Sequence, residues 1–503
     1  MKHLARAAFA VFALTAGALS ASAQTHLRIG LAEDPDVLDP SLARTYVGRI
    51  VFASICDKLF DIDEKLNVVP QLALSSETSD DGKQVLIKLR PGVKFHDGEA
   101  FDAEAAKFSL ERHMNMQGSF RKPEVSSIEK VEVVDPLTIK LVLKAPFSPL
   151  IAQLTDRAGM MVSPKAAKEA GDKFGLKPVC AGPYKFVERV QQDRIVVEKF
   201  ADYWNKANVF IDKITYLPVT DSTVRLANLR AGQLDLIERP LATDLKDMRA
   251  DPKLKVATAL ELGYRSLNLN VGKGDASKVF ADKRIREALS LAIDRKALND
   301  VVFNGEFVPG NQWVSPKHPY YQESVPVPAR DLARAKKLIA ESGVSTPIAI
   351  DLMTPNNPET RQVAEILQAM TAEAGFDMKI RVTEFATSLN EAEAGRYQGY
   401  LIGWSGRTDP DGNIYTFAKT GQPNNYSAYS DPEVDAALDE ARLKSSVPDR
   451  KAVYGKIVKK LTTEGGIIYL YHVQNIITYS ARLEGFKPIS DGLVRVVGLK
   501  FKS

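Results

Sequence analysis

The sequence predicts an α/β protein built from about three structural units, one of which is an α+β segment. Its 503 residues exceed the roughly 100–200 residues of a single domain. The composition, 45% hydrophobic and 26% charged with only 2 Cys, is that of an ordinary globular protein. It excludes collagenous, low-complexity and disulfide-scaffold classes. The third observation is an alternation of helical and strand patterns in the second half of the chain.

That alternation runs through four consecutive segments. Residues 328–342 place apolar side chains at helical spacing and end at a glycine, and residues 359–374 repeat this pattern. Between and after them, residues 348–353 and 378–383 have the composition of strands. Helices and strands in this order are typical of crossover units in a mainly parallel sheet.

The first half of the chain has a different order of elements. Residues 84–144 contain a strand at each end and one helix, at 103–114, which is closer to an α+β arrangement. Asp431 and Pro432 resemble the N-cap and first-turn proline of another helix. Further strands are predicted at 26–31, 194–200 and 213–219.

Residues 1–23 have the features of a secretory signal. A charged start with Lys2 and Arg6 precedes an apolar stretch and a small-residue cleavage site that ends at Ala23. A membrane anchor is the alternative, but an apolar run this short spans a bilayer poorly. We therefore expect cleavage after Ala23 and a periplasmic protein. Because the first cysteine is Cys56, no thiol lies at the processing site, and we expect no lipoprotein.

No pattern of catalytic or cofactor chemistry stands out. The six histidines are scattered, with no i, i+4 pair and no cysteine near them, so the sequence does not support a metal site. No P-loop occurs, and we expect no cofactor. With a net charge of +4 and no long basic block, nucleic-acid binding is not expected. Two of the many carboxylates could meet in space, so an exported hydrolase stays open as an alternative.

Several short motifs, each weak alone, occur in a fixed order along the chain. The most specific block is LRPGVKFHDG at residues 89–98. The others are Leu38-Asp39-Pro40, Gly182-Pro183-Tyr184, RLANLRAGQLD at 225–235, RIREAL at 284–289, Trp404 and Tyr429-Ser430-Asp431-Pro432. In this order they resemble the extracytoplasmic solute-binding proteins, family 5, of ABC transporters. That family has dipeptide-, oligopeptide-, nickel- and opine-binding members, and the resemblance covers nearly the whole mature chain.

The resemblance implies a two-lobed periplasmic binding protein of type II, in the large cluster C form. The implied parts are lobe I (24–66, 180–258 and 478–503), an inserted α+β subdomain (67–179) and lobe II (259–477). Closure about hinge segments near 258–264 and 469–477 would enclose a solute and present a new surface to a permease. The LRPGVKFHDG block is structural in this interpretation, with His96 at a strand-end turn.

The two cysteines are departures from the family pattern. Cys180 precedes the Gly-Pro-Tyr motif, and Cys56 precedes the end of an early helix. In an oxidising compartment they can pair; the alternative is two buried thiols. Because both segments belong to the same lobe in the family fold, the resemblance favours a disulfide between Cys56 and Cys180.

Another departure concerns the ligand site. Peptide-binding relatives carry, three residues after the tryptophan of the Gly-Trp motif, an aspartate that pairs with the α-ammonium of the peptide. Here that position is Arg407. A guanidinium repels an ammonium and binds a carboxylate or phosphate. Two alternatives stay open: Arg407 pairs with Asp409 or Asp411, or Asp409 takes over the amine contact. The ligand-binding residues expected are Arg44, Thr45, Tyr46, Trp313, Gly403, Trp404, Ser405, Arg407 and Asp409.

The resemblance therefore implies the periplasmic substrate-binding component of an ABC importer rather than an enzyme. It would capture a peptide-like or small anionic, carboxylate-bearing and opine-like solute by hinge closure, and deliver it to permease subunits in the inner membrane. The alternatives are an ordinary di- or oligopeptide-binding protein and, in a different class, an exported hydrolase on the same scaffold. Direct capture of nickel lacks support because the histidines are scattered, whereas nickel bound through a small chelator that supplies the ligands stays open. A monomer is expected.

Overall fold

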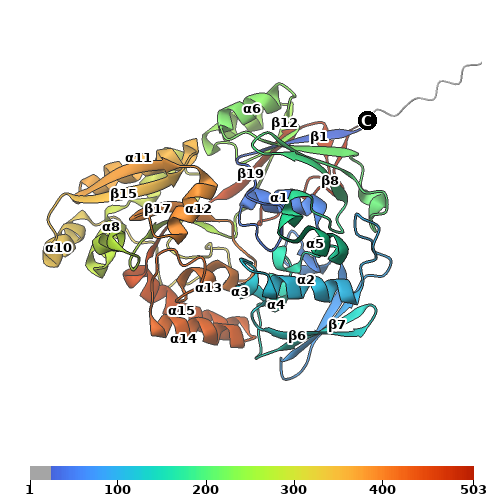
Figure 1. Cartoon of the computed structure of the whole chain (residues 1–503). Coiled ribbons are helices and arrows are strands. Elements are labelled where there is room, and N and C mark those ends of the chain that lie inside the picture. Colours follow the sequence, from blue (N-terminus) through green and yellow to red (C-terminus); the bar gives the residue numbers. More distant parts are fainter. Residues whose placement is uncertain (1–23, 503) are drawn as a thin grey trace, which may run out of the picture.

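Two β-sheets form the framework of the two halves of the molecule (Figure 1). In a computed structural model that describes residues 24–502, one sheet has seven strands in the order β12-β19-β11-β1-β10-β9-β8. The other has six, in the order β14-β18-β13-β17-β15-β16. The two-lobed α/β fold expected from the sequence is confirmed. The predicted signal sequence, residues 1–23, lies outside the described residues.

The seven-stranded sheet is built around β1 (His26–Leu31), which pairs in parallel with β10 and β11. Alternate side chains of β1 are fully buried, as expected of a central strand. The other strands are β8 (Tyr184–Val190), β9 (Arg194–Lys199), β10 (Lys213–Pro218), β11 (Leu236–Glu238), β12 (Leu254–Leu260) and β19 (Gln474–Ser480). The helices of this half are α1 (Tyr46–Ile55), α6 (Ser222–Arg230) and α7 (Leu245–Ala250).

The six-stranded sheet contains the predicted crossover unit. Strand β15 (Ile348–Pro355), helix α11 (Pro358–Ala372) and strand β16 (Phe376–Thr383) form it, and the two strands are parallel. The remaining strands are β13 (Tyr264–Leu269), β14 (Val308–Pro309), β17 (Gly399–Trp404) and β18 (Ile467–His472). Strand β13 is antiparallel to both β17 and β18, so the prediction of a mainly parallel sheet was wrong: the sheet is mixed.

Seven further helices belong to this half, and three of them (α13 to α15) form a separate group below the sheet in Figure 1. Their bounds are α8 (Lys283–Ala292), α9 (Arg295–Phe303), α10 (Leu332–Ser342), α12 (Phe385–Glu393), α13 (Asp411–Ala418), α14 (Pro432–Leu443) and α15 (Val447–Glu464). Asp431 caps α14 and Pro432 opens it, as the sequence predicts. Helix α10 begins after its own cap, Asp331, a few residues later than predicted.

A four-stranded antiparallel sheet, in the order β4-β5-β7-β6, lies beside the seven-stranded half (Figure 1). Its helix α2 shares a hydrophobic core with the sheet. The bounds in this part are β4 (Ala73–Thr78), β5 (Gln84–Leu89), α2 (Ala103–Asn115), α3 (Lys122–Val125), β6 (Ile128–Asp135), β7 (Thr138–Leu143), α4 (Leu150–Gln153) and α5 (Pro164–Ala170). Two small hairpins, β2 (Phe60–Ile62) with β3 (Val68–Pro70) and β20 (Leu483–Glu484) with β21 (Lys500–Phe501), complete the strands.

The chain crosses between the two large sheets at two short segments. Strand β12 of the seven-stranded sheet ends at Leu260, and β13 of the six-stranded sheet begins at Tyr264. On the return, β18 ends at His472 and β19 begins at Gln474. Only these few residues separate strands of one sheet from strands of the other. Among residues 24–502, none of the helices is long and apolar enough to cross a membrane.

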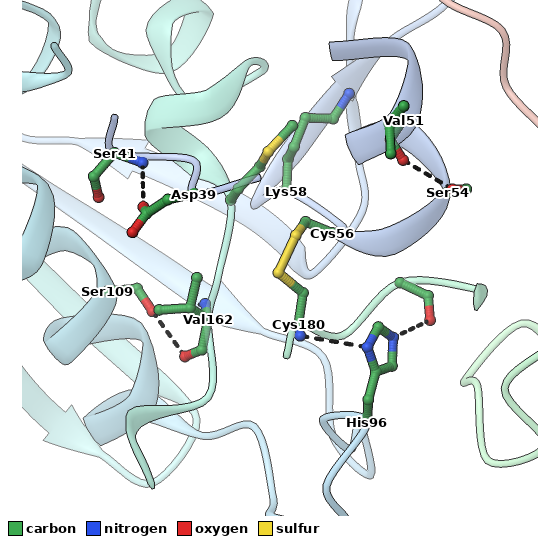
Figure 2. Close-up of a disulfide and its surroundings, with 12 residues drawn as sticks. Asp39, Ser41, Val51, Ser54, Cys56, Lys58, His96, Ser109, Val162 and Cys180 are labelled. Atoms are coloured by element: carbon green, nitrogen blue, oxygen red, sulfur yellow. Dashed lines mark hydrogen bonds between the residues drawn. A yellow bond between two sulfur atoms is a disulfide. The ribbon is translucent and has the colours of Figure 1, made fainter. Parts of the chain in front are cut away.

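The disulfide between Cys56 and Cys180 is confirmed (Figure 2). Cys56 is the C-cap of α1, and Cys180 lies just before β8, so the bond joins two buried segments of the seven-stranded half. His96 packs beside it as a structural residue. Its Nε2–H donates to the carbonyl of Gly182, so its Nδ1 accepts the N–H of Cys180. Burial lowers the pKa of His96 to about 4, so the ring is neutral near pH 7.

Candidate functional site

A cavity of about 370 Å³ lies between the two large sheets. Its walls include the residues that follow β1 and β15 and those that begin α11, so it occupies the carboxyl ends of strands in both halves. This is where open α/β sheets bind ligands. The charged and aromatic residues that line it are Glu33, Asp34, Arg44, Tyr46, Arg225, Arg239, Arg265, Glu359, Glu384, Phe385, Trp404 and Tyr471.

Two carboxyl groups in the cavity lack a full counter-charge. Glu33 lies 3.6 Å from the guanidinium of Arg239, and Glu359 forms no ion pair within 4.0 Å among the described residues, although Arg265 and Arg239 act on it from further away. Burial raises the pKa of Glu33 to about 7, although Arg239 opposes this effect. Burial also raises the pKa of Glu359. A cationic group placed beside either side chain would favour its ionised form, so the cavity can bind an ammonium.

Arginines form the rest of the charged lining. Arg239 lies 3.3 Å from the buried carboxylate of Glu238, and its guanidinium covers the ring of Tyr46 at 4.2 Å. Arg265 on β13 is held by Glu261 at 2.8 Å. The neighbouring strand carries Gly403, where a Cβ would lie 2.4 Å from the Arg265 side chain. The glycine therefore makes room for the guanidinium, and the cavity offers groups that bind a carboxylate as well as groups that bind an ammonium.

The loop after β17 is held by Asn413, a fully buried residue of α13. Its Oδ1 accepts the indole N–H of Trp404 (3.0 Å) and the backbone N–H of Arg407 (2.7 Å). Its Nδ2 donates to the carbonyls of Leu262 (3.2 Å) and Arg407 (3.1 Å). Gly406, with φ of +79°, provides the left-handed turn between them. One amide thus uses all four of its hydrogen bonds to place Trp404 and Arg407.

Arg407 is buried and meets a carboxylate from another part of the chain. Its Nε lies 3.1 Å from Asp156, a residue between α4 and β8, and its guanidinium packs 4.4 Å from the ring centre of Trp404. The pairing with Asp409 or Asp411 that the sequence allowed is not formed in the described structure. Asp409 is bound by Arg450 and Asp411 by Arg442, in both cases through two hydrogen bonds.

The structure places five of the nine predicted ligand-binding residues on the cavity wall: Arg44, Tyr46, Gly403, Trp404 and Ser405. Thr45 instead caps α1 and is bonded to Asp36. Trp313 is buried against Tyr454 in the core near α15. Asp409 and Arg407 do not line the cavity, because the first is occupied by Arg450 and the second faces a smaller hollow described below.

Sequence reasoning missed Glu33, Arg239, Arg265 and Glu359. None of them lies in a motif that draws attention. A usable signal was present for two of them, because Glu33 and Glu359 closely follow predicted strands whose carboxyl ends face the cavity. Among the described residues, no group of three or more His, Cys, Asp or Glu side chains is arranged to hold a metal ion.

The substitution Glu33→Gln should change how stability depends on pH. The folded-state pKa of Glu33, about 7, lies above its unfolded value of about 4.3, so ionisation of Glu33 destabilises the wild type as pH rises between these values. The variant lacks this effect. Its free energy of unfolding relative to wild type should rise by about 2–3 kcal/mol from pH 5 to pH 8 in urea titrations. A difference that stays constant over this range would contradict the assignment; the exposed Glu365→Gln gives the flat reference.

Two lobes with a charged cavity between them define the class: a solute-binding receptor that encloses its ligand. Residues 67–425 match the profile of the bacterial extracellular solute-binding proteins, family 5, middle region. The chain belongs to this family, whose members are the substrate-binding components of ABC importers and not enzymes. The exported hydrolase is thereby set aside.

Similar proteins cover nearly the whole chain. The glutathione-binding protein GsiB of Pectobacterium atrosepticum is 31% identical over 468 residues, which is 91% of this chain and 90% of that protein. GsiB of Salmonella paratyphi A is 32% identical over 483 residues, 93% of each chain.

Two solved structures share the fold. AgaA from A. tumefaciens R10, in complex with agropinic acid, is 25% identical with a TM-score of 0.87, covering 95% of this chain and 99% of that one. DppA from Helicobacter pylori, in complex with the peptide STSA, has a TM-score of 0.88 at 24% identity, covering 95% of this chain and 98% of that one.

Proposed function

We propose that this chain is the periplasmic receptor of an ABC importer for a peptide-like or opine-like solute that carries both a carboxylate and an ammonium group. The observation that carries the proposal is the mixed lining of the cavity. Glu33 and Glu359 offer carboxyl groups that are not bonded to a counter-ion at hydrogen-bond distance, while Arg44, Arg239 and Arg265 offer guanidinium groups. Its volume of about 370 Å³ falls within the range of small-molecule sites.

The names of the relatives support this class of solute. GsiB is a glutathione-binding protein, and AgaA was solved with agropinic acid. Glutathione is a peptide with more than one carboxylate and one ammonium, so it needs sites of both signs. An ordinary di- or oligopeptide, the alternative weighed from the sequence, needs the same two kinds of group but only one carboxylate.

Within the cavity, Trp404 and Tyr46 provide the apolar faces. The Trp404 ring is fixed by Asn413 and by the edge of Phe417, and the Tyr46 hydroxyl donates to the carbonyl of Gly492 at 2.5 Å. A guanidinium covers part of each ring, that of Arg407 on Trp404 and that of Arg239 on Tyr46, and the part of each ring that lines the cavity can pack against the solute without losing further freedom. Ser405 and Gly403 complete this wall from β17 and its loop.

Capture would proceed by closure of two lobes about the segments that link β12 to β13 and β18 to β19. We propose the division into lobe I, the inserted subdomain (67–179) and lobe II, with the lobe boundaries moved to these crossings, because β12 runs to Leu260 and β19 starts at Gln474 within the seven-stranded sheet. Arg44 already reaches from the first half to α12 of the second, donating to Asn390 at 2.9 Å. The closed form would then deliver the solute to the permease.

Export and assembly complete the proposal. We propose cleavage of the signal sequence after Ala23, a protein that is periplasmic and not a lipoprotein, and a monomeric state. Mass spectrometry of a periplasmic extract gives the mature N-terminus, and size-exclusion chromatography with light scattering gives the molecular mass.

The test is a thermal-shift screen of the mature protein with glutathione, octopine, alanyl-alanine and N-acetyl-alanyl-alanine. A compound at 100 times its dissociation constant stabilises the folded state by about 2.7 kcal/mol, which moves the melting temperature by a few degrees. We expect glutathione or octopine to stabilise the protein and the N-acetylated dipeptide not to. Stabilisation only by the N-acetylated compound, or by none of the four, would refute the proposal.

The role of the cavity carboxyl groups is tested by Glu359→Gln, since Glu359 has no ion pair to lose among the described residues. We expect at least tenfold weaker binding of the ammonium-bearing compounds, measured by isothermal titration calorimetry. Glu365→Gln, on the exposed side of the same helix α11, is the matched control and should bind as the wild type does. Equal affinities of the two variants would exclude Glu359 from the site.

A further inference from the structure

A second, smaller hollow of about 40 Å³ adjoins the main cavity, and its lining is dominated by arginine. We call it the arginine pocket. Its charged lining residues are Arg44, Arg121, Arg157, Arg407 and Arg442 against only Glu124 and Asp411. The two hollows share Arg44 and Trp404 as wall residues. A solute in the main cavity therefore has this pocket next to it.

The arginines come from three separate parts of the chain. Arg44 precedes α1, Arg121 and Arg157 lie between α2 and β8, and Arg407 and Arg442 belong to the six-stranded half. The pocket is therefore assembled only where the two halves of the molecule meet. A solute group in this pocket would therefore be enclosed when the two lobes close.

Positive charge exceeds negative charge in and behind this pocket. Arg442 is matched by Asp411, and Arg121 by Glu124. Arg49, Arg157 and Arg407, by contrast, share the single carboxylate of Asp156: the distances are 2.6 Å from Arg49, 3.1 Å from Arg407 and 3.7 Å from Arg157. All four side chains are at most 5% exposed. Three buried guanidinium groups thus share one counter-charge, which is costly without a further anion.

Unused donors point to the same conclusion. Arg407 Nη2, Arg157 Nε and Arg121 Nε are buried and have no hydrogen-bond partner in the described structure. Each belongs to a residue that lines the pocket and is no more than 5% exposed. Burial lowers the pKa of Arg407 to about 10, and burial together with Arg121 lowers the pKa of Arg157, despite the opposing effect of Asp156. Buried donors of this kind are ordinarily satisfied.

We infer that the arginine pocket binds one carboxylate of the transported solute while the body of that solute occupies the main cavity. The solute in this inference rests on the proposed function, whereas the anion site itself does not. A space of 40 Å³ holds a few water-sized groups, which suits a carboxylate and excludes a whole amino acid. The bound oxygens would accept from the free N–H groups of Arg407 and Arg157, and the added negative charge would balance the surplus guanidinium.

The assignment implies a solute with an anionic end separated from its ammonium. The ammonium would lie toward Glu33 and Glu359, on the walls formed after β1 and at the start of α11, and the carboxylate would lie beyond Trp404. A second carboxylate could still meet Arg239 or Arg265 in the main cavity. Compounds that place a side-chain or terminal carboxylate away from the ammonium fit this pattern.

The test uses acetate and inorganic phosphate as probes, so it does not require the solute. Each is titrated at constant ionic strength into the mature wild type, Arg407→Gln and Arg121→Gln, with binding followed by calorimetry. Arg361→Gln, on the exposed face of α11, is the matched control. We expect one equivalent of acetate or phosphate to bind the wild type and the control, and at least tenfold weaker binding in the other two. Two pocket variants are used so that one poorly folded variant, identified by circular dichroism, leaves the other to decide.

Absence of anion binding to the wild type, or equal binding in all four proteins, would overturn the inference. A further arm distinguishes the source of the anion. Acetate is titrated again in the presence of saturating glutathione or octopine, whichever binds in the thermal-shift screen. Loss of acetate binding supports a solute carboxylate in the pocket, whereas unchanged acetate binding would show that the pocket takes free anions only and refute the inference. Failure of the screen itself would refute the proposed function and leave the acetate result standing.

Discussion

Replacing Asp156 by asparagine should lower the free energy of unfolding by about 3–5 kcal/mol, the cost of removing one partner from a buried ion pair. The Asp156 carboxylate is 4% exposed and faces Arg49, Arg157 and Arg407. Burial alone would raise its pKa, but Arg407, Arg49 and Arg157 hold that pKa well below the usual range. The carboxylate therefore stays ionised and is the counter-charge of all three arginines.

The asparagine variant removes the negative charge of the side chain and keeps its shape. Asp156 Oδ1 also accepts the backbone N–H of Arg157, and the asparagine carbonyl can keep this bond. Urea unfolding at pH 7 measures the loss, with Glu365→Gln as the control for removal of an exposed carboxylate, expected to change stability by no more than about 0.5 kcal/mol. A loss below about 1 kcal/mol for Asp156→Asn would show that the arginines are neutralised by other means.

Removal of the disulfide should also lower the free energy of unfolding by a large amount. The bond joins residues 124 apart in the sequence, and the chain-entropy relation gives about 5 kcal/mol for a loop of that length. The double variant Cys56→Ala with Cys180→Ala is preferred over serine, because both positions are at most 1% exposed and a hydroxyl there would be buried without a partner.

The measurement is again the free energy of unfolding in urea, for the double variant and for oxidised wild type. The wild type treated with a reductant under denaturing conditions and refolded with blocked thiols serves as the control, and it should approach the variant. If the variant were as stable as the oxidised protein, the loop would already be constrained in the unfolded chain. Solute binding should survive, because neither cysteine lines the cavity.

Local structure followed closely from local sequence. The strands predicted at 26–31 and 348–353 are present, the latter extended to Pro355, and the caps Asp331 and Asp431 define helix starts by short-range hydrogen bonds. The directions of the strands could not be predicted, because apolar composition indicates that a strand is buried but not which strand pairs with it. The antiparallel pairing of β13 with β17 and β18 depends on residues far apart in the chain.

The candidate site, too, could be predicted from the sequence only in part. The resemblance placed Trp404 and Tyr46 on the cavity, because motif position carries over between relatives. It did not identify the partner of Arg407, because Asp156 reaches it from the opposite half of the molecule while the nearer Asp409 is taken by Arg450. Charge partners of buried groups are set by packing between distant segments, which a single sequence does not display.

The way Asn413 holds the loop after β17 bears on how receptors of this kind could diversify. The path of that loop depends mainly on one amide in α13 and on the turn at Gly406, and the side chain of Arg407 adds one hydrogen bond, to the carbonyl of Gly406 at 2.8 Å. Most of the bonds that hold the loop would survive a change of charge at position 407, but such a change also has to leave Arg49 and Arg157 a counter-charge, because both share Asp156 with Arg407. A receptor that changes the charge at this position can thus keep the backbone of the loop, while the network around Asp156 has to be rebuilt as a whole.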